Sequence, residues 1–174
     1  MSTLTKVSET AETGADYVIV GDLGEAWNFA ILNRAFRLLY STPETKLIAL
    51  GMTRYWTSTD GVSLDVAPFV AALQHATCRE PVVLGKPGRD FFLGAASQLN
   101  LPPEEVLMIG DDIRADVGGA QSVGMRAALV RTGKFREEDL AGDIRPDAVL
   151  DSVADLADDR LGALGVVGDQ SVDT

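Results

Sequence analysis

This sequence of 174 residues has little of several features that define other protein classes. Its single cysteine, Cys78, excludes an internal disulfide and fits a reducing compartment. No apolar run is long enough to span a bilayer. The first 14 residues are polar, and they lack the apolar core of a signal peptide. Together these absences predict a globular protein of the cytoplasm.

Positive charge is also scarce, because 15 lysines and arginines face 26 acidic residues and the formal net charge is -11. Such a chain disfavours a nucleic-acid partner, since binding a phosphate backbone requires a basic face. The charge does not exclude a small anionic substrate, because a metal ion can reverse the field inside one site. The hydrophobic content of 46% is ordinary for a globular protein, and the length fits one domain or two small ones.

Short apolar runs alternate with helical periodicity along the chain, which predicts an α/β fold. We expect strands at 17–21, 46–50, 81–85, 106–110, 127–130 and 148–150. We expect helices at 25–40, 66–76, 90–100, between Asp116 and Gly124, and at 153–164. Asp65 is expected to cap the second of these helices, and Asp60-Gly61 predicts a turn. Residues 1–14 are expected to be disordered and residues 165–174 frayed.

The stretch from Val106 to Ala120 gathers acidic residues at the end of a strand. Asp111 and Asp112 follow the apolar run directly, and Asp116 lies four residues further on. In an open α/β sheet, ligands bind beyond the carboxyl ends of the parallel strands. Two acids at that position suit a hard cation such as Mg²⁺. Asp116 is expected to be the N-cap of the next helix and Gly124 to end it. The alternative is a solvated acidic loop without a function.

A lysine follows an earlier strand, in the sequence Gly85-Lys86-Pro87. Lysine offers a point charge to phosphate oxygens, and a cation can bridge phosphate to protein carboxylates. Lys86 and the later acids therefore indicate phosphate handling. Their order argues against a phospho-acceptor receiver domain, in which the acids precede the lysine. The sequence also contains no glycine-rich phosphate loop of the Walker type.

These two stretches resemble the third and fourth motifs of the haloacid dehalogenase superfamily. Other segments fit the branch of that family with a large α/β cap: Arg54-Tyr55, Asp60-Gly61, Leu64-Asp65-Val66, Val130-x-Thr132-Gly133-Lys134 and Pro146-Asp147. The resemblance covers residues 16–157. It implies an α/β cap domain at 15–79 and, at 80–164, the C-terminal half of a Rossmann-like core in which helices flank a parallel sheet. Residues 165–174 would form a flexible tail.

The resemblance also implies roles for single residues. Lys86 would steady the phosphoryl group and the nucleophile, and Asp116 would pair with that lysine and orient it. Asp111 would bind Mg²⁺, and Asp112 would belong to the same metal site as a neighbour, either outside the coordination shell or bound through water. A cap segment selects the substrate in this family, and the matching residues here are Arg54, Tyr55 and Trp56. An ordinary surface hairpin explains those three residues equally well.

The family's first strand ends in Asp-x-Asp, whose first acid attacks phosphorus, and this sequence contains no Asp-x-Asp. In the most similar stretch, Val18 to Gly24, a glycine stands where the second acid would be. The Ser or Thr motif that binds phosphate before the cap is also missing. We therefore expect a Mg²⁺-dependent phosphatase, for a phosphorylated small molecule or pyrophosphate, that is truncated and inactive alone. The alternative is a catalytically silent binding or dimerisation module.

Loss of the nucleophile's strand predicts a further property of the chain. Strand 106–110 would have an unpaired edge, and such edges invite pairing with other chains. We expect marginal stability or a homo-oligomer. His75 and Cys78 are spaced like metal ligands, but no second pair exists, so packing is the better interpretation.

Overall fold

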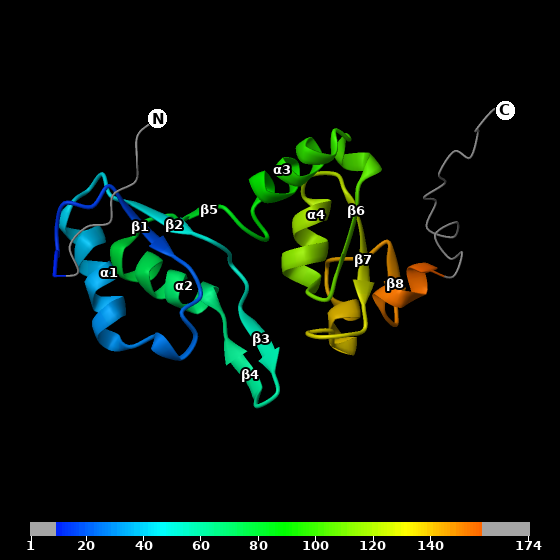
Figure 1. Ribbon diagram of the computed structural model, residues 1–174, viewed down its shortest axis with the longest axis horizontal. Coiled ribbons are helices and arrows are strands. Elements are labelled where there is room, and N and C mark those ends of the chain that lie inside the picture. Colours follow the sequence, from blue (N-terminus) through cyan, green and yellow to red (C-terminus); the bar gives the residue numbers. More distant parts are fainter. Residues whose placement is uncertain (1–9, 158–174) are drawn as a thin grey trace. The chain divides into compact units, whose positions relative to one another are not determined.

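A computed structural model describes residues 10–157, which divide into two compact units (Figure 1). The first unit is Met1–Phe91 and the second is Phe92–Thr174. Each unit contains a three-stranded parallel sheet with helices packed on it. The predicted fold class, α/β with parallel sheets and flanking helices, is confirmed. No helix within residues 10–157 is long and apolar enough to cross a membrane.

The first unit is built on the sheet β1-β2-β5. Its elements are β1 (Tyr17–Val20), α1 (Phe29–Ser41), β2 (Lys46–Ala49), β3 (Tyr55–Ser58), β4 (Gly61–Leu64), α2 (Val66–Thr77) and β5 (Val82–Val83). Strands β3 and β4 form an antiparallel hairpin, and Gly61 has a φ of 123° at its turn, where Asp60-Gly61 predicted one. Asp65 caps α2 as predicted, since its carboxylate accepts the Val66 N–H at 2.7 Å.

Helix α1 begins four residues later than its predicted start. Gly24–Ala26 forms a separate 3₁₀ turn, and Asn28 then adopts an extended conformation with a φ of -152°. The Asn28 side chain accepts the Ile31 N–H at 3.0 Å and so caps the helix. The helix therefore starts at Phe29, because a residue in that conformation cannot belong to a continuous helix.

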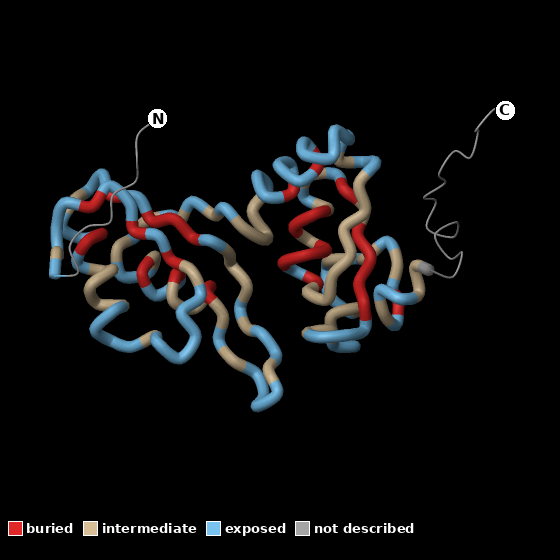
Figure 2. The backbone as a smooth tube through the Cα atoms, viewed as in Figure 1, coloured by how far each residue is buried: buried red, intermediate tan, exposed pale blue. Residues whose placement is uncertain are grey.

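The two faces of the β1-β2-β5 sheet differ in their covering. Alternate strand residues, namely Val18, Val20, Leu47, Ala49 and Val83, pack against α1 and α2 in one core. On the other face, apolar residues alternate with the packed ones or directly follow a strand. They include Tyr17, Ile19, Leu50, Val82 and Leu84, which are 46% to 55% exposed. Figure 2 shows this unit with buried and exposed segments side by side along the strands. The sheet therefore has one packed face, and on its other face, apart from the buried Ile48, these apolar side chains are left open by the elements of the first unit.

The segment before β1 is attached to α1. Arg34 Nε donates to the Ala11 carbonyl at 3.2 Å, and Ser41 Oγ donates to the Glu12 carbonyl at 3.2 Å. Arg37 forms an ion pair with Glu12. Residues 10–14 therefore differ from the disorder expected for 1–14, and residues 1–9 lie outside the described part.

The boundary between the units also differs from the position placed at 79/80. Strand β5 pairs in parallel with β2, with Ala49 opposite Val83, so it belongs to the sheet of the first unit. Arg79, which follows α2, is bound to the loop between α1 and β2 of the same unit. Its guanidinium donates to the carbonyls of Thr42, Pro43 and Thr45. The first unit continues to Phe91, within helix α3 (Arg89–Leu99).

The second unit is built on the sheet β6-β7-β8. Its elements after α3 are β6 (Leu107–Gly110), a π-helical turn (Ile113–Gly118), α4 (Gly119–Gln121), β7 (Arg126–Val130), a 3₁₀ helix (Glu137–Ala141), β8 (Ala148–Leu150) and a second 3₁₀ helix (Val153–Ala157). Residues 158–164 of the predicted last helix, and the predicted tail, lie outside the described residues.

Gly124 is the C′ residue that stops the helical segment after β6, as predicted. Gly124 has a φ of 91°, and its N–H donates to the Gln121 carbonyl at 3.1 Å. The Met125 N–H donates to the Ala120 carbonyl at 3.2 Å, which completes a Schellman motif. Behind this helix, Phe92, Val117 and Leu129 are at most 1% exposed in the core of the unit.

Candidate active site

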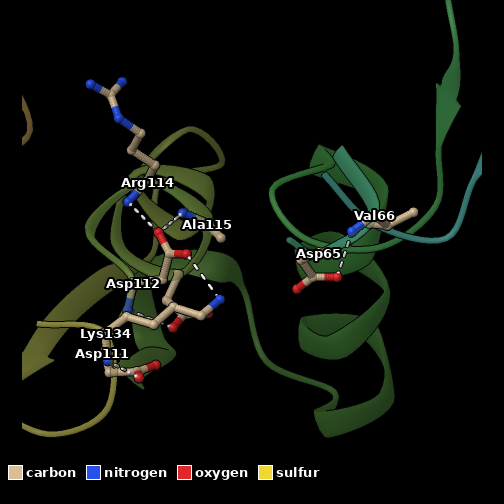
Figure 3. Close-up of polar contacts among 8 residues, drawn as sticks. Asp65, Val66, Asp111, Asp112, Arg114, Ala115 and Lys134 are labelled. Atoms are coloured by element: carbon tan, nitrogen blue, oxygen red, sulfur yellow. Dashed lines mark hydrogen bonds and ion pairs between the residues drawn. The ribbon is translucent and has the colours of Figure 1, made fainter. Parts of the chain in front are cut away.

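Three aspartates and one lysine meet at the carboxyl end of β6. Asp111 and Asp112 follow Gly110 directly, Asp116 lies in the π-helical turn, and Lys134 comes from the loop after β7. Figure 3 shows Lys134 beside both Asp111 and Asp112, with Arg114 and Ala115 above Asp112. The sequence predicted the position of the three acids at a strand end, where open α/β sheets place their ligands.

Asp112, and not Asp116, caps the helix that follows β6. Asp112 Oδ1 accepts the Arg114 N–H at 3.0 Å and the Ala115 N–H at 2.9 Å. These two N–H groups open the turn and have no partner within it. The prediction of Asp116 as the N-cap is therefore wrong, because the helical turn begins at Ile113, immediately after the strand.

Asp116 is instead a buried residue of the turn, only 2% exposed. Its Oδ2 accepts the Asp112 N–H at 3.1 Å. Gly110 makes this approach possible, since a Cβ at that position would lie 2.2 Å from the same oxygen. The turn is widened here, because the Asp112 carbonyl accepts the Asp116 N–H at 2.9 Å and also the Val117 N–H at 3.3 Å.

Asp111 is held from the other side of the site. Its Oδ2 accepts the Lys134 N–H at 2.8 Å, across 23 residues of sequence. Gly133 has a φ of 55°, and a Cβ there would lie 1.8 Å from the same oxygen. The Lys134 side chain turns to the second acid, with Nζ 3.4 Å from Asp112 Oδ2. Sequence reasoning matched Thr132-Gly133-Lys134 to a family motif and gave it no role at the site.

The donor chemistry of this site fits a hard cation in part. Carboxylate oxygens are the ligands that Mg²⁺ prefers, and Asp111 Oδ1 has no hydrogen-bond or ion-pair partner within residues 10–157. Both oxygens of Asp112 already have partners. Among the described residues, no group of three or more His, Cys, Asp or Glu side chains could hold a metal ion. Asp111 therefore offers one carboxylate oxygen that a cation could bind, and any further ligands would have to come from elsewhere.

Lys86 lies in the first unit, in the turn after β5. Its carbonyl accepts the Met52 N–H at 2.8 Å, and the Lys86–Pro87 peptide bond is cis. The turn is packed closely against the end of β2, since a Cβ on Gly85 would lie 2.0 Å from the Leu50 carbonyl oxygen. The backbone at Lys86 is thus fixed within its own unit, whereas the three acids belong to the second unit.

The three residues of the expected substrate segment begin the β3–β4 hairpin of the first unit. The Arg54 carbonyl accepts the Asp65 N–H at 3.1 Å, which joins the hairpin to the start of α2. The Arg54 guanidinium lies 5.8 Å from the centre of the Tyr55 ring, and Trp56 is 39% exposed. Arg54 and Trp56 are exposed and Tyr55 is half-buried, which fits both a substrate segment and an ordinary surface hairpin.

Comparison with known proteins gives consistent matches. Residues 83–156 match the HAD-hydrolase-like family. Phospholysine phosphohistidine inorganic pyrophosphate phosphatase of Xenopus laevis is 48% identical over 122 residues, which are 70% of this chain and 45% of that protein. The chain spans about half the length of the curated relatives that it matches.

Solved structures give the same picture of the fold. The p-nitrophenyl phosphatase from Archaeoglobus fulgidus superposes with a TM-score of 0.70 at 30% identity, over 82% of this chain and 56% of that one. A glycerol phosphate phosphatase from Mycobacterium tuberculosis, solved in complex with calcium, superposes with a TM-score of 0.63 at 25% identity, over 77% of this chain and 39% of that one.

Proposed function

We propose, from the premise that this chain belongs to the haloacid dehalogenase superfamily, that it supplies part of the active site of a metal-dependent phosphatase. One observation carries the proposal: Asp111, at the carboxyl end of β6, keeps one carboxylate oxygen without a protein partner within residues 10–157. The substrate would be a phosphate monoester or pyrophosphate. The names of the relatives support this choice, since they describe pyrophosphate and p-nitrophenyl phosphate hydrolysis.

Each predicted site residue has a place in this proposal. Lys86 would contact the phosphoryl group as a point charge, and Asp116 would orient that lysine. Asp111 would hold Mg²⁺, with Asp112 beside it, and the bound cation would neutralise charge on the phosphate. The β3–β4 hairpin would select the substrate through Arg54, Tyr55 and Trp56.

The sequence contains no Asp-x-Asp, so the chain supplies no counterpart of the family's attacking acid. We therefore propose that the chain alone binds phosphate and Mg²⁺ but does not turn substrate over, because groups that act as a unit lose most of the rate together.

The lone cysteine is consistent with a cytoplasmic location.

The experiment is a titration of the ¹⁵N-labelled full chain with pyrophosphate in the presence of Mg²⁺. Lys86 and Asp111 lie in different units, so shifts of both amides with one dissociation constant support a single site. Lys86→Met should abolish these shifts, and Lys46→Met, which removes an exposed lysine of β2, should keep them. Absence of any shift at Lys86 contradicts its proposed role. Robust turnover of p-nitrophenyl phosphate that depends on Asp111 contradicts the proposed inactivity.

A second candidate function, a silent binding or dimerisation module, is favoured by two uncovered surfaces. All-parallel sheets occur almost only with both faces covered, yet in the β1-β2-β5 sheet Ile19 and Val82 are exposed on either side of the buried Ile48. Within residues 10–157, strand β6 pairs with β7 alone and so has one unpaired edge. We propose that these surfaces drive self-association. The open face belongs to the unit that carries 10 of the 26 acidic residues, where charge repulsion is weaker.

Light scattering at several protein concentrations tests this second proposal. The double variant Ile19→Thr/Val82→Thr keeps β-branched side chains but makes the open face polar, and we expect it to shift the protein toward monomer. Phe29→Ser is the matched control, because Phe29 is 82% exposed on α1 and not on the sheet. A wild-type chain that is monomeric at all concentrations and melts cooperatively would contradict the proposal.

A further inference from the structure

The two adjacent acids after β6 have different environments. Both oxygens of Asp112 have protein partners, namely two backbone N–H groups on Oδ1 and the Lys134 ammonium near Oδ2. Asp111 uses only Oδ2, which accepts the Lys134 N–H at 2.8 Å. Figure 3 shows both contacts of Lys134, one from its backbone and one from its side chain. A single residue thus contacts both carboxylates of the pair.

Lys134 is held firmly enough to act in this way. Its side chain is 15% exposed and that of Asp112 is 17% exposed, so solvent screens their attraction less than at an open surface. The next residue, Phe135, packs against the core of the second unit, and its N–H donates to the Thr132 carbonyl at 3.1 Å. The Arg131 guanidinium lies 4.9 Å from the centre of the Phe135 ring. The turn that carries Lys134 is therefore anchored at both ends.

We propose that Lys134 is a positioning residue that separates the roles of the two acids. Its ammonium keeps Asp112 as a capped, ion-paired residue outside the metal's coordination shell, and its backbone N–H leaves Asp111 Oδ1 as the metal-binding oxygen of the pair. This inference rests on the proposed function, since it assumes that Asp111 holds the cation. Of the two positions expected for Asp112, it assigns the one outside the coordination shell, because both of its oxygens have protein partners.

Removal of the ammonium has a definite physical consequence. In Lys134→Met, Asp112 Oδ2 loses its cation while Oδ1 keeps its two backbone donors, so a second carboxylate oxygen becomes available beside Asp111. One neutralising charge is also lost from the site. We expect divalent cations to bind about two- to fivefold more tightly, the range that a partly screened charge pair gives. The tighter binding should depend on Asp112, which the wild-type site does not use.

The experiment uses the full chain and Mn²⁺ alone as the probe, with two readouts: free Mn²⁺ by electron paramagnetic resonance and paramagnetic broadening of amide resonances. In the wild type, Asp111→Asn should remove the broadening around β6, and Asp112→Asn should leave the dissociation constant within twofold. In the Lys134→Met background, Asp112→Asn should return the dissociation constant to the wild-type value. Lys134→Arg keeps the charge and should behave as wild type.

Arg136→Met is the matched control, because it removes a positive charge two residues away whose pair with Glu138 is exposed. It should leave Mn²⁺ binding unchanged. The inference is overturned if Asp112→Asn weakens binding in the wild type as much as Asp111→Asn does. It is also overturned if Lys134→Met and Arg136→Met have the same effect. If Asp111→Asn leaves the wild-type broadening intact, the proposed metal role of Asp111 fails and the inference fails with it. Failure of the proposed function is thus seen with Asp111→Asn, and failure of the inference alone is seen with the Asp112 and Lys134 variants.

Discussion

Replacement of Gly133 by alanine tests the close contact on which the geometry of the site depends. Gly133 has a φ of 55°, and an added Cβ would lie 1.8 Å from Asp111 Oδ2 and 2.9 Å from its Cγ. The carboxylate cannot stay in place, because both distances are shorter than real Cβ contacts. Asp111 has to rotate away and lose the Lys134 N–H, which it accepts at 2.8 Å.

The expected cost follows from two terms. An alanine in the left-handed region costs about 1–2 kcal/mol. Loss of a hydrogen bond to a charged acceptor adds about 1.5–3 kcal/mol, and the lower end applies because Asp111 is only half-buried. Gly124→Ala is the matched control, since Gly124 has a φ of 91° and nothing lies within 4 Å of its Cβ position. Gly124→Ala should therefore show the cost of the left-handed backbone without the cost of a lost hydrogen bond.

Amide hydrogen exchange followed by mass spectrometry can separate these terms. We expect exchange in β6 and β7 to be roughly tenfold faster in Gly133→Ala than in Gly124→Ala, the factor that about 1.4 kcal/mol gives. Both tryptophans, Trp27 and Trp56, lie in the first unit, so their fluorescence in urea provides an internal reference. Equal exchange in the two variants would show that Asp111 does not depend on the glycine, and the reasoning would be refuted.

Three other substitutions test separate parts of the structure. Gly110→Ala would place a Cβ 2.2 Å from the buried Asp116 Oδ2, and we expect a loss of about 1–3 kcal/mol in urea unfolding followed by circular dichroism. Arg79→Met removes the donor to three loop carbonyls, and it should lower the free energy of unfolding, followed by tryptophan fluorescence in urea, by about 1–2 kcal/mol, whereas Arg79→Lys should restore part of this. Asp65→Ala removes the cap of α2 and should cost about 1 kcal/mol in the same assay, with Asp65→Asn close to wild type. An unchanged midpoint in any of the three would contradict the contact that it tests.

Local signals in the sequence were sufficient for most of the strands. β2, β7 and β8 lie within one residue of their predicted limits, because each is a short apolar run bounded by residues that end strands. The start of α2 was predictable because Asp65 precedes an apolar periodicity. The start of α1 was predicted too early, although Asn28 is the same kind of signal. There the helical periodicity continued upstream of the cap, and periodicity alone does not show where a helix begins.

The domain boundary could not be predicted from composition. The change of character near residue 80 is real, but β5 follows it and pairs with β2, which lies more than thirty residues earlier. Strand pairing is a long-range property, and an apolar run of two to five residues fits either unit equally well. The contacts of Arg79 with the loop after α1 likewise join residues about 35 apart, for which no local pattern exists.

The candidate site was predictable in position but not in its internal arrangement. A strand end with three acids is visible in the sequence, whereas the choice of cap between Asp112 and Asp116 depends on whether the helical turn starts at once or after a loop. The structure shows an immediate start, so Asp112 occupies the cap and Asp116 is buried behind Gly110. The roles of Lys86, Asp111, Asp116 and the β3–β4 hairpin stay predictions.

The contact between Lys134 and the acidic pair explains why adjacent identical residues need not be equivalent. Asp111 and Asp112 have the same chemistry and neighbouring positions, so residue type and spacing within the pair give no reason to separate them. Their environments differ because a strand ends between Gly110 and Asp111, which sends successive side chains toward different partners. In the turn after β7, Lys134 contacts both acids. Gly133 allows the turn to lie this close to Asp111, because a Cβ at that position would clash with Asp111 Oδ2. A glycine followed by a lysine after the next parallel strand is thus the feature of the sequence that distinguishes the two acids.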